Sequence, residues 1–210
     1  MNTIAAIATA INNAGINIIR ISGDESLRII GEIFRPANKE KDITKVKSHT
    51  IHYGTITDGD EDIDEVLVSV MKGPKSYTKE DVIEINCHGG AFVTKKILDL
   101  IVNHGAYIAE PGEFTKRAFL NGRIDLSQAE AVMDLISAKN EYAAKSSINQ
   151  LKGRLHDEIK DIRNELIHDL AFIEAALDDP EHIDMEGYNN TIFEHVNDSI
   201  IKLRKLYAML

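Results

Sequence analysis

Hydrophobic residues follow two different periods along the chain, and the change comes soon after residue 110. Before that point, short runs rich in isoleucine and valine are bounded by glycine, asparagine or aspartate, which is typical of β-strands. These runs cover residues 3–9, 15–22, 48–57, 65–71 and 81–87. Two further stretches, 25–34 and 90–103, carry apolar residues three or four positions apart and predict helices. The first half is therefore expected to be an α+β domain.

After residue 110 the spacing of apolar residues is helical. A helix is predicted over residues 113–121 and ends at Gly122, because glycine readily adopts the conformation that terminates a helix. Between residues 141 and 177 apolar side chains recur mostly at intervals of three and four, which predicts one long amphipathic helix. A last helix is predicted from about residue 191. These patterns place an all-α helical domain at 123–210, after the α+β domain at 1–122.

Composition and charge narrow the classes of function. The 210 residues are 43% hydrophobic and carry a net charge of −10, so neither half is a basic clamp for nucleic acid, and any RNA contact is expected to be local or to come from a partner. Cys87 is the only cysteine, which excludes an internal disulfide and indicates a reducing compartment. No run approaches the ~18 apolar residues of a membrane span. A cytoplasmic location without membrane contact is therefore predicted. The eight histidines do not cluster, so no metal site is expected.

One predicted strand, Gly15-Ile-Asn-Ile-Ile-Arg-Ile-Ser-Gly23, has a single cation, Arg20, among apolar neighbours. A buried guanidinium requires an anionic partner, because an unpaired buried charge is costly. The partner is either a carboxylate of the same chain, in an internal salt bridge, or a bound anion.

A second segment, residues 73–90, is a turn-rich loop that leads into a strand and a His-Gly-Gly turn. Strand alternation places Glu84 between apolar residues. Such a carboxylate can accept the paired N–H donors of a heterocycle, or it can pair with Arg20 or Lys75. The turn at His88 either holds a phosphate or only allows a tight connection from strand to helix. We interpret Cys87 as a small buried hydrophobe.

The third segment covers residues 110–131 and begins Glu-Pro-Gly-Glu-Phe-Thr-Lys-Arg-Ala-Phe-Leu-Asn-Gly-Arg. Its predicted helix presents Phe114 and other apolar residues inward, whereas Lys116 and Arg117 are expected to reach solvent. Arg123 lies just past the helix, on a turn.

Taken together, the three segments resemble the MnmE (TrmE) family of tRNA-modifying GTPases. That family has a G-[IV]-[IV]-R-x-S-G strand, an S-[FY]-T-x-E-[DE] loop followed by H-G-G, and a P-G-E-F-[ST]-x-R-A-F-L-N-x-[KR]-[IL]-D-L segment. The resemblance extends from about Thr3 to Asp184. It implies a folate-binding domain with a mixed sheet, similar to the glycine-cleavage aminomethyltransferase, followed by a helical domain. It also implies a homodimer through the first domain, which would cover an apolar N-terminal strand that is otherwise an exposed edge.

The family resemblance implies roles for individual residues. Arg20, Glu84 and Arg123 occupy the folate-contact positions, and none of them is a catalytic group. The implied cofactor is 5-formyl- or 5,10-methylene-tetrahydrofolate. The implied reaction, carried out with the flavoprotein MnmG on tRNA, adds an aminomethyl-type group to carbon 5 of the wobble uridine. GTP, magnesium and potassium would bind only in a GTPase domain that these 210 residues lack, so the chain is expected to be part of a longer hydrolase.

Two alternatives remain open. The family has a Pro-Gly-containing loop before the Arg20 strand, whereas this chain has Ile-Asn-Asn at residues 11–13. This departure favours a non-catalytic dimerisation scaffold whose folate pocket has decayed, whereas the intact Arg20, Glu84 and Arg123 favour a working site. A stand-alone folate-dependent aminomethyltransferase is the other alternative, and the long helical half, which resembles MnmE and not the transferases, argues against it.

The 210-residue chain is expected neither to bind nor to hydrolyse GTP. No segment matches the G-x-x-x-x-G-K-[ST] phosphate loop, and Asn-Lys-Glu-Lys-Asp at residues 38–42 misses the N-K-x-D guanine motif by one position. Without that loop and its magnesium ligand, the phosphates have no cradle. Calorimetric titration with GTP should therefore show no saturable heat. Saturable binding at micromolar GTP would contradict this prediction.

Overall fold

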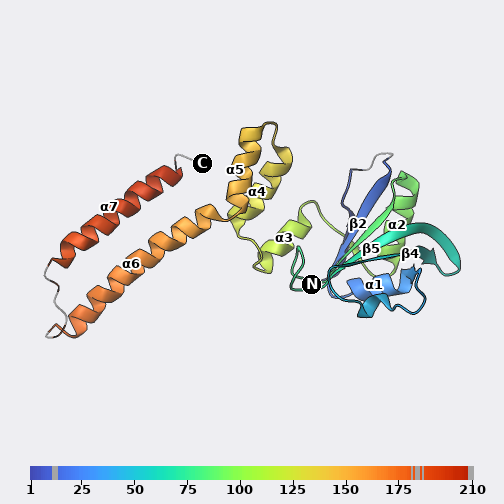
Figure 1. Cartoon of the computed structure of the whole chain (residues 1–210), viewed down its shortest axis with the longest axis horizontal. Helices are drawn as coiled ribbons and strands as arrows, with labels where there is room; N and C mark the ends of the chain where they lie inside the picture. The colour runs from blue at the N-terminus through green and yellow to red at the C-terminus, as the bar shows by residue number, and fades with distance from the viewer. Residues whose placement is uncertain (11–13, 181, 183–184, 186, 208–210) are drawn as a thin grey trace. The chain divides into compact units, whose positions relative to one another are not determined.

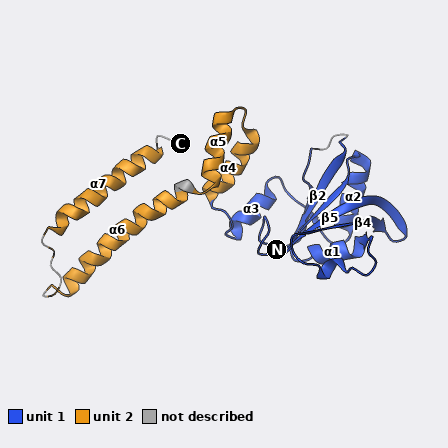
Figure 2. Cartoon of the chain, viewed as in Figure 1, with its two compact units in different colours: residues 1–125 blue, residues 126–210 orange. Residues whose placement is uncertain are grey.

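The computed structural model describes residues 1–10, 14–180, 182, 185 and 187–207. The chain divides into two compact units, residues 1–125 and residues 126–210 (Figure 2). The sequence pattern predicted a boundary after residue 122, whereas the first unit ends at Asp125, so the turn that carries Arg123 belongs to the first unit. The second unit is helical (Figure 2).

The first unit is built on a mixed β-sheet (Figure 1). Its strands are β1 (Ile4–Ile7), β2 (Ile16–Ser22), β3 (Phe34–Pro36), β4 (Thr50–Asp58), β5 (Glu61–Met71), β6 (Val82–His88) and β7 (Tyr107–Ile108). Its helices are α1 (Ser26–Ile33), the 3-10 helix η1 (Ile43–Lys45), α2 (Ala91–Asn103) and α3 (Glu113–Leu120). Within the described residues the seven strands lie in the order β3-β4-β5-β6-β2-β1-β7. The pairing of β1 with β7 is parallel and the other pairings are antiparallel, which confirms the predicted α+β class.

The hydrophobic core lies between one face of this sheet and the helices α1 and α2. Ile19 and Ile21 on β2 and Ile83 and Ile85 on β6 point to this face and are fully buried. Burial of each such side chain stabilises the fold by about 1.5–3 kcal/mol. Because side chains alternate along a strand, the residues between these isoleucines stand on the opposite face of the sheet.

Two strands were not predicted from the sequence. Both β3 and β7 are too short, at three and two residues, to show a periodic pattern. Strand β7 pairs with β1 through Ile4 and Tyr107 on the outer side of β1. The expectation that the N-terminal strand is an exposed edge is therefore wrong, because β1 lies between β2 and β7.

The second unit contains four helices in its described part, α4 (Leu126–Ser137), α5 (Glu141–Leu151), α6 (Arg154–Asp178) and α7 (Tyr188–Tyr207). The single long helix predicted over residues 141–177 is wrong, because the chain breaks between α5 and α6. Gly153 has φ +78°, a left-handed conformation that other residues rarely adopt and that an α-helix does not contain. The apolar spacing continues across the break, so periodicity alone did not reveal it.

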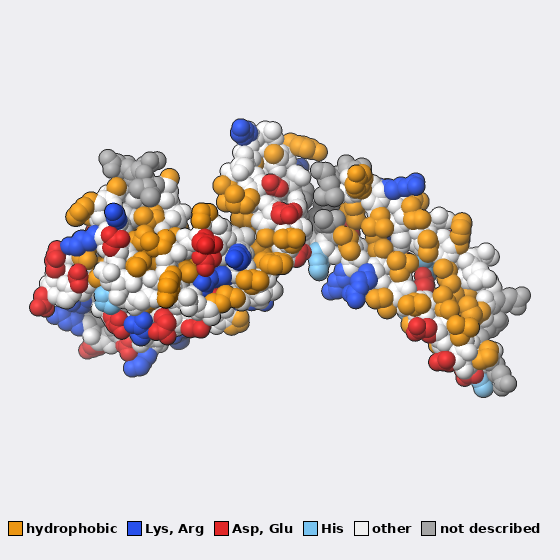
Figure 3. All heavy atoms as spheres, turned by 180° about the vertical axis from the view of Figure 1, so that it is seen from behind, with side chains coloured by type: hydrophobic (Ala, Val, Ile, Leu, Met, Phe, Trp, Pro, Cys, Tyr) orange, Lys and Arg blue, Asp and Glu red, His pale blue; other side chains and the backbone are white. Residues whose placement is uncertain are grey.

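Helices α6 and α7 expose much of their apolar surface. Within the described side chains of the predicted stripe, Ile162 is buried, whereas Leu170 and Leu177 are 55% and 72% exposed. Figure 3 shows hydrophobic side chains gathered along this part of the chain. In the described ranges no helix combines the length and apolar character needed to cross a lipid bilayer.

The turn between β6 and α2 requires glycine at one of its two positions. A Cβ atom on Gly89 would lie 2.0 Å from the carbonyl oxygen of Ala14, a distance at which backbone must move. A Cβ atom on Gly90 would meet no atom within 4 Å. The tight-turn interpretation of the His-Gly-Gly segment thus has a steric basis at Gly89.

We therefore expect Gly89→Ala to lower the free energy of unfolding by about 1–3 kcal/mol, because the added methyl group forces the two backbone segments apart. Thermal unfolding followed by circular dichroism measures the effect. Gly90→Ala is the matched control, and its free energy of unfolding should lie within about 0.5 kcal/mol of that of the parent chain. Equal melting of the two variants would contradict the steric explanation.

Candidate ligand-binding site

Arg20 and Glu84 form an ion pair across two neighbouring strands. The antiparallel register of β2 and β6 places them directly opposite each other, on the sheet face away from α1 and α2. Arg20 Nε donates to Glu84 Oε1 at 2.8 Å, and Arg20 Nη2 lies 2.7 Å from the same oxygen. Both side chains are about a quarter exposed, so a ligand can reach them. The internal salt bridge that the sequence left open as one alternative is present.

Two aromatic rings flank the Arg20 guanidinium. Its Cζ lies 5.5 Å from the ring centroid of Tyr77 and 5.5 Å from that of Phe114, both within the range of a cation–π interaction. The Arg123 guanidinium lies 4.8 Å from the centroid of the same Tyr77 ring. The three residues predicted to contact folate, Arg20, Glu84 and Arg123, are thus brought into one cluster through Tyr77.

Hydrogen bonds tie the loop of residues 73–81 to α3 and the turn that follows it. The amide of Asn121 donates to the Thr78 carbonyl at 2.7 Å, and Lys79 Nζ donates to the Gly122 carbonyl at 2.9 Å. The hydroxyl groups of Tyr77 and Thr115 are hydrogen-bonded at 3.0 Å. These contacts join segments about forty residues apart in sequence. The cluster is therefore assembled by tertiary contacts and not by one local motif.

Arg117 is buried and does not reach solvent, so the prediction made from the sequence for this residue is wrong. Its side chain is 5% exposed and lies 3.1 Å from Glu80 Oε2 and 3.0 Å from Glu113 Oε1. Ser22 donates to the same Glu80 oxygen at 2.6 Å. Burial raises the pKa of Glu113, but the Glu110 backbone N–H and the Arg117 guanidinium outweigh it and hold that pKa below its ordinary value. The four-residue spacing of Glu113 and Arg117 on a predicted helix could have indicated their ion pair from the sequence. No local sequence pattern indicates the contact with Glu80.

His88 is held at the end of β6 by Asp64 on the neighbouring strand β5. Its Nδ1 lies 2.6 Å from Asp64 Oδ1, and its backbone N–H donates to Asp64 Oδ2 at 2.8 Å. The hydrogen bond and the charge of Asp64 raise the pKa of His88 above its ordinary value. Its neighbour Cys87 is buried, and burial raises the pKa of the thiol, as expected of a packing residue and not of a nucleophile.

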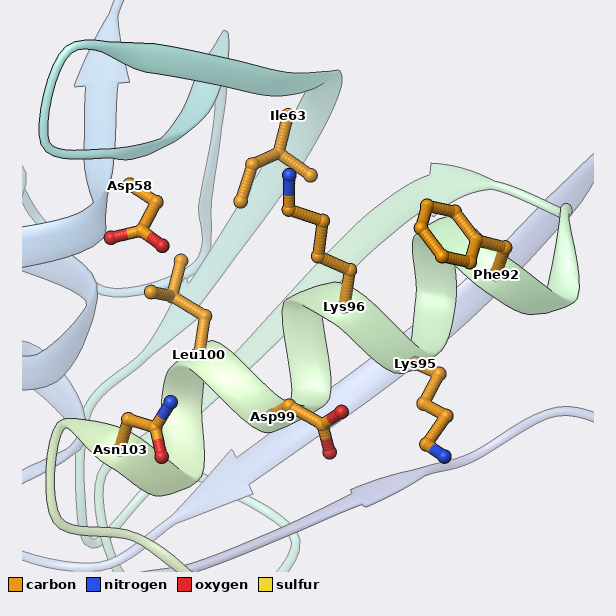
Figure 4. Close-up of a pocket in the computed structure, with 8 residues that line it drawn as sticks. All are labelled: Asp58, Ile63, Phe92, Lys95, Lys96, Asp99, Leu100 and Asn103. Carbon is orange, nitrogen blue, oxygen red and sulfur yellow. The ribbon is translucent and has the colours of Figure 1, made fainter.

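A hollow of about 360 Å³ lies beside α2, and none of the predicted folate residues lines it (Figure 4). Its lining residues are Asp58, Ile63, Phe92, Lys95, Lys96, Asp99, Leu100 and Asn103. Charges of both signs line it, and Lys96 is already paired with Glu61 at 2.7 Å. Its mixed charge does not favour one class of ligand.

The cluster around Arg20 suits a partly anionic ligand that also carries N–H donors. It offers a carboxylate for N–H donors and two guanidinium groups for anionic groups, and the rings of Tyr77 and Phe114 contact these guanidinium groups. Residues 11–13, where the sequence departs from the family pattern, lie outside the described residues. Among the side chains that the structure describes, no group of three histidine, cysteine, aspartate or glutamate residues is placed to hold a metal ion.

Both units match models of known protein families. Residues 3–123 match the family model "GTP-binding protein TrmE N-terminus", and residues 126–209 match the model "MnmE helical domain". The chain is 58% identical over 205 residues to the tRNA modification GTPase MnmE of Lachnoclostridium phytofermentans, an alignment that covers 98% of this chain and 45% of that protein. It is 52% identical over 209 residues to that of Thermoanaerobacter pseudethanolicus, covering 99% and 45%. The chain therefore spans about half the length of the curated relatives that it matches.

The pair of His88 and Asp64 predicts a pH dependence. Because the pKa of His88 is raised in the folded state, the pair contributes stability that is fully present below the unfolded-state pKa and is lost as the pH rises through the folded-state pKa. An NMR titration of the His88 ring should give a pKa above about 6.5, and Asp64→Asn should bring it back toward that value. Asp62→Asn, which changes an exposed carboxylate on the same strand, is the control. An unchanged His88 titration in Asp64→Asn would contradict the assignment.

Proposed function

Because the chain belongs to the MnmE (TrmE) family of tRNA modification GTPases, we propose that it forms the folate-binding and helical part of a tRNA-modifying enzyme. In this proposal the whole protein works with the flavoprotein MnmG and adds an aminomethyl-type group to carbon 5 of the wobble uridine. A reduced folate, 5-formyl- or 5,10-methylene-tetrahydrofolate, binds in the first unit as the one-carbon donor. GTP hydrolysis, with its magnesium and potassium ions, belongs to the part of the enzyme outside these 210 residues.

The observation that carries the folate proposal is the unequal charge of the cluster. Of its two guanidinium groups, Arg20 is paired with the carboxylate of Glu84, whereas Arg123 contacts the Tyr77 ring. In the described part of the chain no carboxylate lies within ion-pair distance of Arg123, so this cation is available for the carboxylate end of a folate. Both Arg20 contacts are with Glu84 Oε1, which leaves Oε2 to accept N–H donors from the aminopyrimidinone edge of a pterin. The ligand thus keeps the Arg20 pair intact and adds to it.

We also propose that the first unit forms a homodimer in the cytoplasm. The sheet face that carries Arg20 has exposed apolar side chains on three strands, with Ile16 on β2, Ile51 and Tyr53 on β4, and Leu67 on β5. The register places Tyr53 opposite Leu67, so these residues adjoin. A contiguous apolar surface of this kind is typical of a protein interface. The lone buried Cys87 is consistent with a reducing compartment.

The second candidate function is a dimerisation scaffold without folate. The observation that favours it is that Glu84 already has a partner in Arg20, so the carboxylate does not require a ligand. The two candidates differ in what the chain binds and not in how it folds. A binding measurement therefore separates them.

Glu84→Gln tests the proposal, because the substituted amide presents a donor where the pterin needs an acceptor. We expect 5-formyltetrahydrofolate to bind the 210-residue chain, and to bind Glu84→Gln about five- to hundred-fold more weakly, as an unmatched polar contact costs about 1–3 kcal/mol. Calorimetry measures both affinities, and light scattering on the same samples gives the oligomeric state.

Glu65→Gln is the matched control, since Glu65 is an exposed carboxylate on β5 bonded to Tyr53 and outside the cluster. Its folate affinity should equal that of the parent chain. If the parent chain is folded and dimeric but gives no heat with the folate, the scaffold function is correct and the folate proposal is wrong.

A further inference from the structure

The Tyr77 ring is shared by two guanidinium groups that both belong to the proposed folate site. Arg20 lies 5.5 Å and Arg123 lies 4.8 Å from its centroid. The two cations come from distant segments, since Arg20 is on β2 and Arg123 follows α3. Within the described residues, Tyr77 is the side chain in cation–π contact with both.

The position of the ring is itself fixed from two sides. The Tyr77 hydroxyl is hydrogen-bonded to Thr115 on α3. The residues that follow Tyr77 are held as well, since the Thr78 carbonyl accepts from Asn121 and Lys79 donates to the Gly122 carbonyl. Movement of the ring therefore breaks its hydrogen bond to α3, and movement of the loop breaks the contacts with the turn before Arg123.

The two cations depend on the ring to different degrees. Arg20 has Glu84 as a charge partner and Phe114 as a second aromatic neighbour. Arg123 is an exposed side chain, and within the described part of the chain its cation–π contact with Tyr77 is the interaction that restricts its long, flexible side chain. Loss of the ring should therefore release Arg123 first.

We propose that Tyr77 is a positioning residue for the folate site, which places the guanidinium of Arg123, and secondarily that of Arg20, before the ligand arrives. The ligand then meets a cation already oriented toward its carboxylate end and does not have to order a free side chain. This inference rests on the proposed folate function. It adds a residue that binds no part of the ligand itself but sets how strongly the two cations bind it.

The test is the affinity of the 210-residue chain for 5-formyltetrahydrofolate, measured by calorimetry with three variants. Tyr77→Leu removes the ring and should weaken binding roughly five- to thirty-fold, the equivalent of losing one to two cation–π contacts. Tyr77→Phe keeps the ring and loses only the hydroxyl contact with Thr115, so it should bind within about three-fold of the parent chain. Tyr142→Leu, which changes an exposed tyrosine on α5 outside the cluster and outside the proposed dimer surface, is the matched control and should not change the affinity.

A double-variant cycle distinguishes positioning from a general structural effect. The quantity compared is the change in the logarithm of folate affinity that Tyr77→Leu causes. In an Arg123→Leu chain this change should be less than half of that in the parent chain, because the main group that the ring positions is already absent. Melting temperatures check that each variant is folded. If Tyr77→Leu is unfolded, Tyr77→Met replaces it, since methionine keeps apolar contact area without a π face.

Three outcomes decide the question. Weak binding by Tyr77→Leu, rescue by Tyr77→Phe and coupling to Arg123 together support the inference. Parent-like binding by Tyr77→Leu, or losses that simply add in the Arg123→Leu chain, overturn it and leave the folate function standing. Absence of folate binding by the folded parent chain overturns both.

Discussion

The antiparallel register of β2 against β6 determines what each face of the first unit does. Arg20 stands opposite Glu84, and Ile19 and Ile21 stand opposite Ile85 and Ile83. The isoleucines are buried under α1 and α2, and this fixes the charged pair on the other face. A shift of one residue would exchange the two faces, placing the charges in the core and the isoleucines outside. The hydrophobic core and the candidate site are therefore consequences of the same strand pairing.

A second layer of contacts turns this charged pair into a binding site. The loop of residues 73–81 places Tyr77 beside Arg20. Helix α3 places Phe114 beside the same guanidinium, and the turn after α3 places Arg123 beside Tyr77. The buried Arg117 of α3 holds the helix on this loop through Glu80, and it is also paired with Glu113 of its own helix. Removal of one partner from such a network is costly, because the remaining charges are left buried without compensation. The position of α3, and with it Arg123, depends on this network.

The two units differ in how their apolar residues are used. In the first unit the isoleucines and valines of β2, β5 and β6 close one core under two helices. In the second unit α6 and α7 leave large apolar side chains such as Leu177 and Phe193 in solvent. The first unit thus has a self-contained core, whereas the helical unit leaves much of the apolar surface of α6 and α7 exposed.

The sequence by itself determined the strands β2, β4, β5 and β6, the helices α1, α2 and α3, and the family, because each rests on a local period or on a contiguous motif. It also identified Arg20, Glu84 and Arg123 as the residues to examine, through the family resemblance. Short pieces such as β7, and the break at Gly153 inside a continuous apolar pattern, escaped it because periodicity needs length and does not register a single left-handed residue. Only the tertiary structure decided that Arg117 is buried and that Tyr77 joins the two cations. Those contacts link segments about forty or more residues apart, and no local pattern encodes which side chains meet when such segments pack.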